Sequence, residues 1–303
     1  GRIDPTTPAF EDSRKSLAAQ FKFQGKSVIV VANHFNSKGG DQPLFGKNQP
    51  PVLKSEVQRM EIAKIVNGFV QDVKAKDPNA NVILLGDFND FEWSNPLETL
   101  KGNELVNMVE KVPADQRYSY SYQGNAQVLD HILVTKNMEA ATIVNMVHIN
   151  SGFMEEHGRA SDHDPLLIQT DLKAIEKVYN KVYNLTGFKT KKLVVGTTNS
   201  LINIDSTSVI TNGIWLKKSA DVKGAGLATT LVAISPAQSG AIIELSGETV
   251  KEVFIDNANV TEIHGAENVQ SWDVKDGVDT SNIKFYDSEG NLLQSPFQMA
   301  LAS

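Results

Sequence analysis

Two apolar runs with a long amphipathic segment between them constrain the fold of this chain more than any other feature. Residues 27–32 (SVIVVA) and 81–85 (NVILL) are nearly continuous apolar runs, rich in β-branched side chains. Such runs are typical of strands that are buried on both faces. Residues 56–76 place apolar side chains at helical spacing, and Asp77-Pro78 would end that helix. Strands with a covering helix predict a layered α/β or α+β sandwich.

The chain, at 303 residues, is longer than most single domains, and its two parts differ in kind. Residues 1–172 carry the strand and helix pattern, with further strands expected at 128–135 and 165–170. From 193 to 303, short apolar runs alternate with turn signals, which predicts an all-β sandwich, barrel or solenoid. We find no clean internal repeat there. Residues 173–192 are expected to be a linker, as a helix or a connecting segment.

Composition excludes several classes of protein. The net charge of −7 argues against a protein that coats nucleic acid through a basic surface, but it allows an enzyme that holds a phosphodiester through bound cations. The absence of cysteine excludes disulfides, thiolate zinc sites and a cysteine nucleophile. No apolar run approaches the ~20 residues that span a bilayer. No signal peptide opens the chain, and we expect it to begin inside a longer protein.

Polar residues cluster where the expected strands begin or end. They are Asn33-His34, Asp87, Asn89, Asp130-His131 and Asp162-His163-Asp164. Side chains at strand ends in a layered α/β fold line a common crevice. Carboxylate and amide oxygens suit Mg²⁺, Mn²⁺ or Ca²⁺ better than zinc. A carboxylate beside an imidazole sets the charge and tautomer that a histidine needs at a phosphate.

Each of these residues, taken singly, has a plainer structural interpretation. Asp87 is typical of a turn or helix N-cap, and His34 of a structural histidine. Asp162-His163 is also compatible with an Asx turn. His148 and His157 fit no pattern, and we expect both at the surface. Only the ordered set of residues favours a catalytic site over these structural roles.

That ordered set resembles the endonuclease/exonuclease/phosphatase family, which has the DNase I-like fold. The matching stretches are 13–21 (SRKSLAAQF), 33–38 (NHFNSK), 86–89 (GDFN), 129–134 (LDHILV) and 161–165 (SDHDP). The resemblance covers residues 1–172, and Gly-Asp-Phe-Asn and Ser-Asp-His are its most specific motifs. Residues 42–51 with Ser55, Glu56 and Arg59 resemble the secreted bacterial nuclease branch of the family. The resemblance implies a four-layer α/β sandwich, of which this chain holds the C-terminal part.

The resemblance also implies catalytic roles. His163 would contact the scissile phosphate as the acid–base histidine, with Asp130 orienting and charging it. His34 would be a second histidine at the phosphate. Asp87 would orient or activate the attacking water.

Metal and phosphate contacts are implied as well. Asp162, with Asp87 and Asn89, would bind a divalent cation, Mg²⁺ before Mn²⁺ or Ca²⁺. Asn89 would also contact phosphate oxygens, and Arg14 a substrate phosphate. The family's N-terminal half supplies a metal-binding Glu, an Asn and the acidic partner of the first histidine, and it lies outside this sequence. We therefore expect this chain to be poorly active alone.

The activity implied is hydrolysis of a phosphodiester by in-line attack of water, assisted by the cation. We expect an extracellular or cell-surface deoxyribonuclease or broad nuclease, with DNA as the favoured substrate. A family phosphatase or phospholipid phosphodiesterase, acting on nucleotides, inositol phosphates or sphingomyelin, is the first alternative, because loops choose the substrate. The second alternative is a surface-binding or adhesive protein with a degenerate nuclease half. Under any of these, residues 193–303 are candidates for attachment to a cell surface, for secretion or for substrate presentation.

Overall fold

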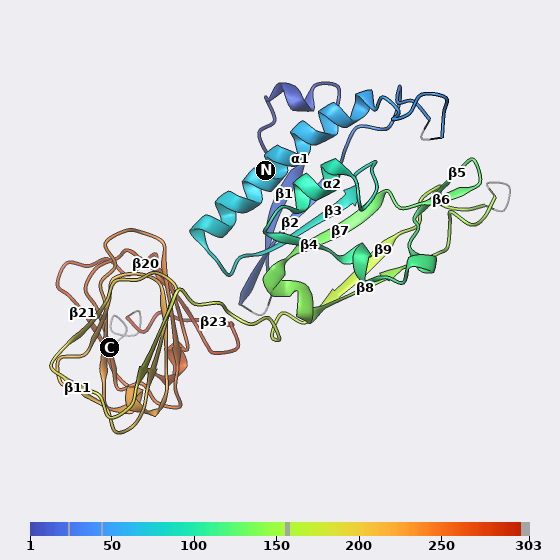
Figure 1. The fold of residues 1–303 in the computed structure, drawn as a ribbon. Coiled ribbons are helices and arrows are strands. Elements are labelled where there is room, and N and C mark those ends of the chain that lie inside the picture. Colours follow the sequence, from blue (N-terminus) through green and yellow to red (C-terminus); the bar gives the residue numbers. More distant parts are fainter. Residues whose placement is uncertain (24, 44, 155–157, 298–303) are drawn as a thin grey trace. The chain divides into compact units, whose positions relative to one another are not determined.

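A computed structural model describes residues 1–23, 25–43, 45–154 and 158–297. The chain forms two compact units, one from residues 1–23 and 27–177 and the other beginning at Val178 (Figure 1). Each has its own hydrophobic core. Within the described ranges, no helix is long and apolar enough to cross a membrane.

The first unit is built on a five-stranded sheet. Its strands, in spatial order, are β1 (Leu17–Phe23), β2 (Lys26–His34), β3 (Asn81–Asp87), β7 (Asp130–Thr135) and β4 (Leu105–Asn107). β2 and β3 run parallel, whereas β7 is antiparallel to both β3 and β4. Parallel neighbours need a crossover connection, which α1 (Lys54–Lys76) provides between β2 and β3.

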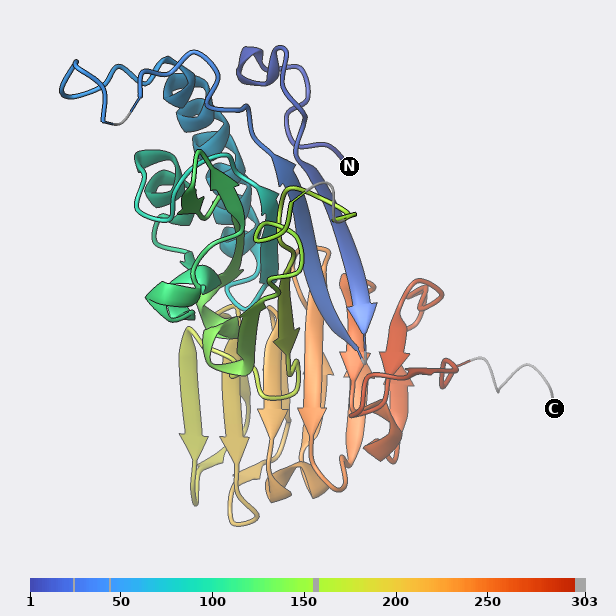
Figure 2. The same cartoon turned by 90° about the vertical axis from the view of Figure 1, so that its right-hand side faces the viewer.

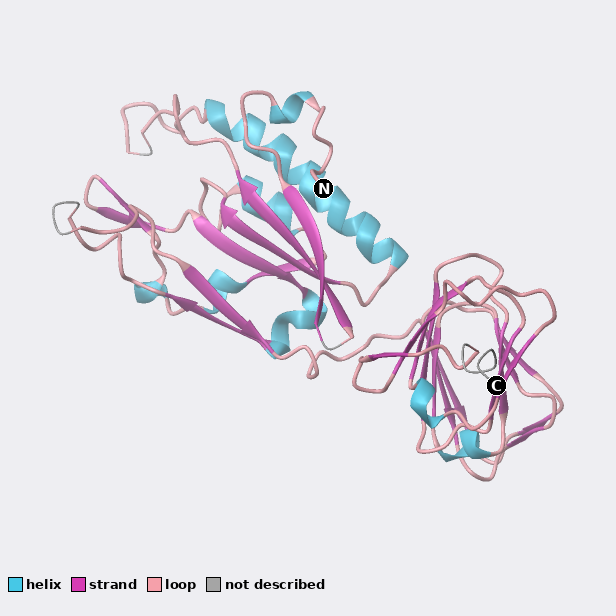
Figure 3. Ribbon diagram, turned by 180° about the vertical axis from the view of Figure 1, so that it is seen from behind, coloured by secondary structure: helices cyan, strands magenta, loops and turns pink. Residues whose placement is uncertain are grey.

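One face of this sheet is covered by helices. α1 and the shorter α2 (Asn95–Lys101) lie along it, as Figure 3 shows. Ile62 and Val66 of α1 are fully buried in one cluster with Val31 and Leu84 of the sheet. The apolar spacing that predicted the helix is the spacing of this buried face.

A two-stranded antiparallel sheet, β8 (Thr142–Met146) and β9 (Leu166–Thr170), shares a hydrophobic cluster with the other face. In that cluster Ile132 and Val134 of β7 pack with Ile168 of β9. Of the four layers expected, the described residues therefore form three: helices, the five-stranded sheet and a two-stranded sheet. The remaining elements of this unit are the hairpin β5 (Tyr120–Tyr122) and β6 (Asn125–Gln127), and the 3-10 helices η1 (Pro8–Phe10), η2 (Met108–Lys111), η3 (Ala114–Gln116) and η4 (Lys136–Ala141).

The second unit is a β-solenoid, in which each strand pairs in parallel with the equivalent strand of the next coil (Figure 2). The larger sheet contains β10 (Lys181–Leu185), β13 (Ser200–Ile204), β16 (Ala220–Lys223), β18 (Ala241–Ser246), β20 (Val260–His264), β22 (Lys284–Tyr286) and the antiparallel β23 (Leu292–Leu293). The second sheet contains β12 (Leu193–Val195), β15 (Ile214–Leu216), β17 (Leu231–Ile234), β19 (Glu252–Ile255) and β21 (Trp272–Val274). The corners hold the short pair β11 (Lys189–Thr190) and β14 (Val209–Ile210), and the 3-10 helices η6 (Ala225–Ala228) and η7 (Ala266–Asn268).

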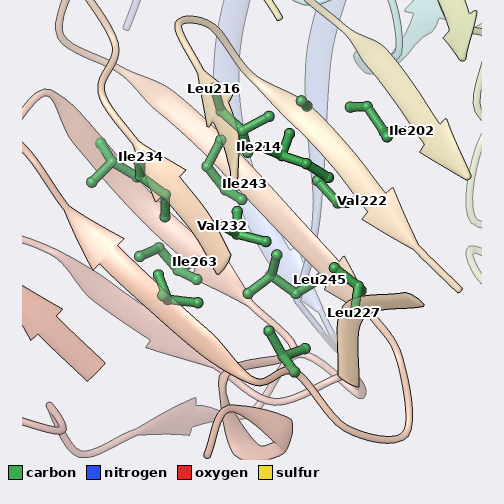
Figure 4. Close-up of a cluster of buried hydrophobic side chains, with 14 of the residues drawn as sticks. Ile202, Ile214, Leu216, Val222, Leu227, Val232, Ile234, Ile243, Leu245 and Ile263 are labelled. Carbon is green, nitrogen blue, oxygen red and sulfur yellow. The ribbon is translucent and has the colours of Figure 1, made fainter. Parts of the chain in front are cut away.

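The solenoid interior is filled by stacked aliphatic side chains (Figure 4). Ile202, Val222, Ile243 and Ile263 occupy successive strands of the larger sheet, and each is fully buried. A single coil cannot bury its own apolar face, so stacking of neighbouring coils creates the core.

The solenoid differs from the sequence-based expectations in two respects. The predicted linker 173–192 contains β10 and β11, so the solenoid begins inside it. A repeat is also present, since Ser200 pairs with Lys181, Ala220 with Ser200, and Ile243 with Ala220, at spacings of 19, 20 and 23 residues. Unequal coil lengths explain why no fixed period is visible in the sequence.

Candidate active site

Three site residues lie in one row across three adjacent strands. His34 at the end of β2 pairs with Asp87 at the end of β3, and Asp87 pairs with Asp130 at the start of β7. Residues directly opposite each other on neighbouring strands present their side chains on the same face of a sheet. Strand register therefore brings together residues that are up to 96 positions apart in the chain, His34 and Asp130.

His163 joins this row from the segment before β9. Its Nδ1 lies 2.6 Å from Oδ2 of Asp130. Ser119 Oγ donates a second hydrogen bond to the same carboxylate oxygen at 2.7 Å, and it accepts the backbone N–H of Asp130. The ring of Tyr120 lies 4.7 Å from the His163 ring, between centroids. The imidazole is thus held on one side by a carboxylate that is itself fixed.

Asp87 is held from its other side by Asn89 and faces His34. Asn89 donates its backbone N–H to Asp87 Oδ1 at 2.8 Å and its side-chain amide to Oδ2 at 3.2 Å. The φ of Asn89 is +53°, in the left-handed region that Asn tolerates better than most residues. His34 Nε2 lies 3.5 Å from Asp87 Oδ2.

The charges of the row are coupled. The pKa of Asp87 is raised, first by burial and then by the neighbouring charge of Asp130, although the Asn89 backbone hydrogen bond opposes the shift. The pKa of His163 is also raised, mainly by its hydrogen bond to Asp130. This combination provides a carboxylate with increased affinity for a proton and an imidazole that keeps its proton.

A divalent cation, which family members generally use, fits part of this donor set. Asp87, Asp130 and His163 each have a potential ligand atom, and these atoms lie within 4.8 Å of one another. The two carboxylates are the ligands that fit, because the His163 ring keeps its proton. Two half-buried carboxylates repel each other, as the raised pKa of Asp87 shows after the effect of burial, and a cation would relieve that repulsion. Oxygen donors of this kind suit Mg²⁺, Mn²⁺ or Ca²⁺.

Asp164 fixes the segment that carries His163. Its buried carboxylate accepts the backbone N–H groups of Ile149, Asn150 and Ser151 at 2.7–3.0 Å, and the Ser151 hydroxyl donates to it as well. Burial alone would raise the pKa of Asp164, but the hydrogen bonds from Ser151 and Asn150 outweigh it and lower the pKa overall. Asp164 is a structural residue of the Ser-Asp-His-Asp motif.

A buried arginine fixes the loops beside Asp87 and His34. Arg59 of α1 is fully buried and donates Nε–H to Asp90 at 2.8 Å. Lys38 donates to the other oxygen of Asp90 at 2.7 Å, and Ser55 Oγ accepts from Arg59 Nη1 at 2.6 Å. An ion pair with this many hydrogen bonds ties residues 36–38 to Asp90 and Phe91. The sequence indicated Arg59 only through its resemblance to the nuclease branch.

Gly86 is required by the close approach of β2 and β3. Its φ is +133°, and a Cβ at this position would lie 2.0 Å from the carbonyl oxygen of Asn33. Asn33 is opposite Gly86 in the register and is itself buried, where it accepts a hydrogen bond from Ser16 Oγ at 2.7 Å. The glycine therefore allows the strands to pair one residue before His34 and Asp87.

The structure brings together most, though not all, of the predicted site residues. The five that lie together are His34, Asp87, Asn89, Asp130 and His163. Arg14 is exposed and makes no hydrogen bond or ion pair to them within the described ranges. Asp162 is exposed and lies outside the group that could hold a metal, whereas Asp130, to which no metal role was given, lies inside it.

Sequence reasoning missed the supporting residues Ser119, Tyr120 and His148. His148 was expected at the surface, but its ring stacks on Tyr118 at 3.8 Å and its Nδ1 lies 3.3 Å from Asp164. No motif marks these positions, because their partners are set by tertiary structure. His157, also expected at the surface, lies outside the described residues.

Several solved structures are similar to part of this chain. A humanized TDP2 of D. rerio is 21% identical, with 54% of this chain and 61% of that chain covered and a TM-score of 0.37. Sphingomyelinase C from Streptomyces griseocarneus is 19% identical, covering 52% and 57%, with a TM-score of 0.36. The human Nocturnin catalytic domain is 16% identical, covering 51% and 50%, with a TM-score of 0.35. The chain thus spans between half and two thirds of these proteins. No curated protein matches it.

One family model matches the chain over residues 2–162, which is more than half of its length. The model describes the Endonuclease/Exonuclease/phosphatase family, whose members hydrolyse phosphate esters. The matched residues contain four of the five clustered site residues, and the fifth, His163, follows directly. This confirms the family that the motifs predicted: the chain belongs to the endonuclease/exonuclease/phosphatase family.

Proposed function

We propose that the first unit carries the catalytic histidines of a metal-dependent phosphodiester hydrolase that cleaves nucleic acid, with DNA as the favoured substrate. The observation that carries this proposal is the continuous row His34–Asp87–Asp130–His163. An extracellular or cell-surface location belongs to the same proposal. It rests on the resemblance of residues 42–51 to those of secreted bacterial nucleases.

Two groups of the row transfer protons in this proposal: His163 donates one and Asp87 accepts one. Asp130 engages Nδ1 of His163 and keeps the ring protonated, so Nε2–H is the group that can donate to a phosphoryl or leaving oxygen. Asp87, with its raised pKa, accepts the proton of the attacking water. His34 lies beside Asp87 and adds a second imidazole on the same face. Attack of water and departure of the leaving group are thereby assisted from neighbouring positions.

A bound divalent cation would neutralise the charge that develops on the phosphoryl oxygens. Asp87 and Asp130 are the carboxylates of this chain that would hold it, and Asn89 lies against Asp87. The family resemblance implies a further Glu and Asn as ligands, which are not among the residues that we assign to this site. The carboxylate pair of this chain thus contributes part of the metal site.

A substrate panel tests the proposal in the full protein. Plasmid DNA, RNA, bis-p-nitrophenyl phosphate and nucleoside monophosphates are incubated with Mg²⁺ and, separately, with EDTA. We expect cleavage of DNA and of the synthetic diester, loss of both in EDTA, and little release of phosphate from monoesters. A preference for monoesters would overturn the nuclease assignment in favour of a phosphatase. A preference for sphingomyelin in a parallel assay would favour a phospholipid phosphodiesterase.

Variants of the same protein separate the enzyme from a binding protein. Asp87→Asn removes the proposed base, whereas Asp115→Asn makes the same change at an exposed carboxylate without a role in the site. We expect Asp87→Asn to slow cleavage by about 100-fold or more, the size of a lost general base, and Asp115→Asn to leave it unchanged. No cleavage of any substrate by the parent protein would favour an adhesive role instead.

A further inference from the structure

Charge is distributed unevenly along the solenoid. Between residues 178 and 230 the sequence has seven lysines and two acidic residues, whereas residues 231–303 have three lysines and eleven acidic residues. Because the coils stack in sequence order, the first coils form a basic end and the later coils an acidic one (Figure 2). The net charge of the whole chain conceals this basic end.

Aromatic and aliphatic side chains line the outer face of the sheet that contains β12, β15, β17 and β19. The residues that point outward in one cross-strand row are Val194, Trp215, Ala233 and Phe254. Their sequence neighbours on the same strands, such as Ile214 and Leu216, face the core. The Trp215 and Phe254 rings lie 6.2 Å apart, and Ala233, which lies between them in the row, is fully buried although it faces outward. The structure thus places Trp215 on the outer face of this sheet.

Two lysine ammonium groups approach the ring of Trp215. Lys192 Nζ lies 3.7 Å from the ring centroid and Lys217 Nζ lies 5.7 Å from it. Lys217 is positioned by Ser235, whose hydroxyl accepts from it at 2.7 Å. Lys192 is exposed, as is its neighbour Lys191. The indole itself is fixed, because its Nε1–H donates to the Asn212 carbonyl oxygen at 3.0 Å.

We propose that this Trp215 surface, formed by Lys191, Lys192, Lys217, Trp215 and Phe254, binds single-stranded nucleic acid. Non-specific single-strand sites combine cationic side chains that follow the phosphates with aromatic rings on which bases stack. In this surface a base occupies the ring face that Lys192 covers, and the displaced ammonium group contacts the adjoining phosphate. The proposal takes its choice of polyanion from the function proposed above, and the cation and ring arrangement is independent of it.

The aromatic ring favours nucleic acid over other polyanions. A sulfated polysaccharide would be attracted by the lysines but has no flat π-face to stack on an indole. The acidic later coils also limit the surface, because the row continues to Asp273 beside Phe254 and the charge there is negative. A short strand crossing β12 and β15 fits this arrangement better than a long duplex.

Binding is measured by fluorescence anisotropy with a labelled oligothymidylate of about 20 nucleotides, long enough for one such site. The protein carries Asp87→Asn so that the probe stays intact, which makes the result independent of hydrolysis. We expect Trp215→Ala to weaken binding about tenfold and Trp215→Phe to restore most of it. Replacing Lys191 and Lys192 with Ala should reduce the slope of log K against log salt by about one per lysine.

The matched controls are Lys251→Ala and Lys284→Ala, which remove exposed lysines of the later coils. Both should bind the probe as the parent does. Equal effects of these lysines and of Lys191 and Lys192 would overturn the proposal, as would unchanged binding in Trp215→Ala with an unchanged unfolding temperature. Heparin that competes equally well with parent and Trp215→Ala protein would identify a general polyanion site instead.

Discussion

At the scale of single residues, the candidate site depends on the Asp130 carboxylate, which interacts with two neighbours, His163 and Asp87. Asp130 accepts from Ser119 and holds His163, and its charge also raises the pKa of Asp87 after the effect of burial. One substitution at Asp130 should therefore lower the pKa of both neighbours, for two different reasons. The imidazole would lose its partner, and the second carboxylate would lose its repulsion.

The first prediction concerns the titration of His163. Asp130→Asn should lower the pKa of His163 toward its ordinary value, because the carboxylate hydrogen bond is the main cause of its rise. NMR titration of the imidazole resonances measures this directly. Since the folded pKa is raised, the pair stabilises the fold fully below the unfolded pKa near 6.5, and this contribution is lost as pH rises through the folded pKa. A midpoint that does not move in Asp130→Asn would contradict the pairing.

The second prediction concerns Asp164, whose pKa shift has the opposite sign to that of His163. Its folded pKa is lowered, so its contribution is present above the ordinary value of 3.8 and is lost as pH falls through the folded pKa. Asp164→Asn should lower the free energy of unfolding by about 1.5 to 3 kcal/mol near neutral pH, through weakened bonds to buried N–H groups. Urea unfolding at acidic and neutral pH should show a smaller pH dependence in this variant. Asp115→Asn is the control and should behave as the parent.

At the scale of elements, strand register assembles the site. A shift of β3 by one residue against its neighbours would turn Asp87 to the other face of the sheet. The pairing of Gly86 with Asn33 helps to fix this register, because no other residue fits between the strands there. Side-chain chemistry at Asp87 thus depends on a backbone contact one residue earlier.

The third prediction compares two glycines. Gly86→Ala should destabilise the protein by at least about 3 kcal/mol, since it combines a positive φ with a contact of 2.0 Å to backbone. Gly68→Ala in the middle of α1 meets nothing within 4 Å and should stabilise by about 0.5 to 1 kcal/mol. Thermal unfolding of both variants checks the pair. Equal effects would mean that the β2–β3 approach is looser than described.

The sequence predicted elements where local patterns are strong. The strands at 27–32 and 81–85 and the helix at 56–76 appear as β2, β3 and α1, with ends shifted by a few residues. Burial on both faces and helical spacing leave clear patterns. β1 and β8 were missed. β1 is mostly exposed, and β8 places the apolar Ile143 on its exposed side, so neither strand shows a clear alternation of apolar and polar residues.

Five of the clustered site residues were predictable from motifs, and their geometry was not. Motifs indicated His34, Asp87 and His163, but only register shows that the first two lie opposite each other. The Trp215 surface could not be predicted from the sequence either, since Lys192 and Trp215 become neighbours only when successive coils stack. Long-range pairing of this kind leaves no local pattern to read.

At the scale of the whole molecule, the two units have separate hydrophobic cores and should unfold in separate transitions. Ile243 lies in the solenoid core, which shares no buried residue with the core around Val66. Ile243→Ala should destabilise the solenoid by about 2 to 5 kcal/mol and leave the other transition in place. Differential scanning calorimetry resolves this. A single cooperative transition that shifts as a whole would contradict independent units.

The central claim is that His163 and Asp130 act as one unit in phosphodiester hydrolysis. The measurement that tests it most directly is kcat/KM for bis-p-nitrophenyl phosphate in the full protein, for His163→Ala, Asp130→Asn and the double variant. Groups that act as a unit are not additive, so His163→Ala should reduce kcat/KM by about 100- to 10,000-fold and Asp130→Asn should add little to it. An unchanged rate in His163→Ala, or losses that multiply in the double variant, would contradict the claim.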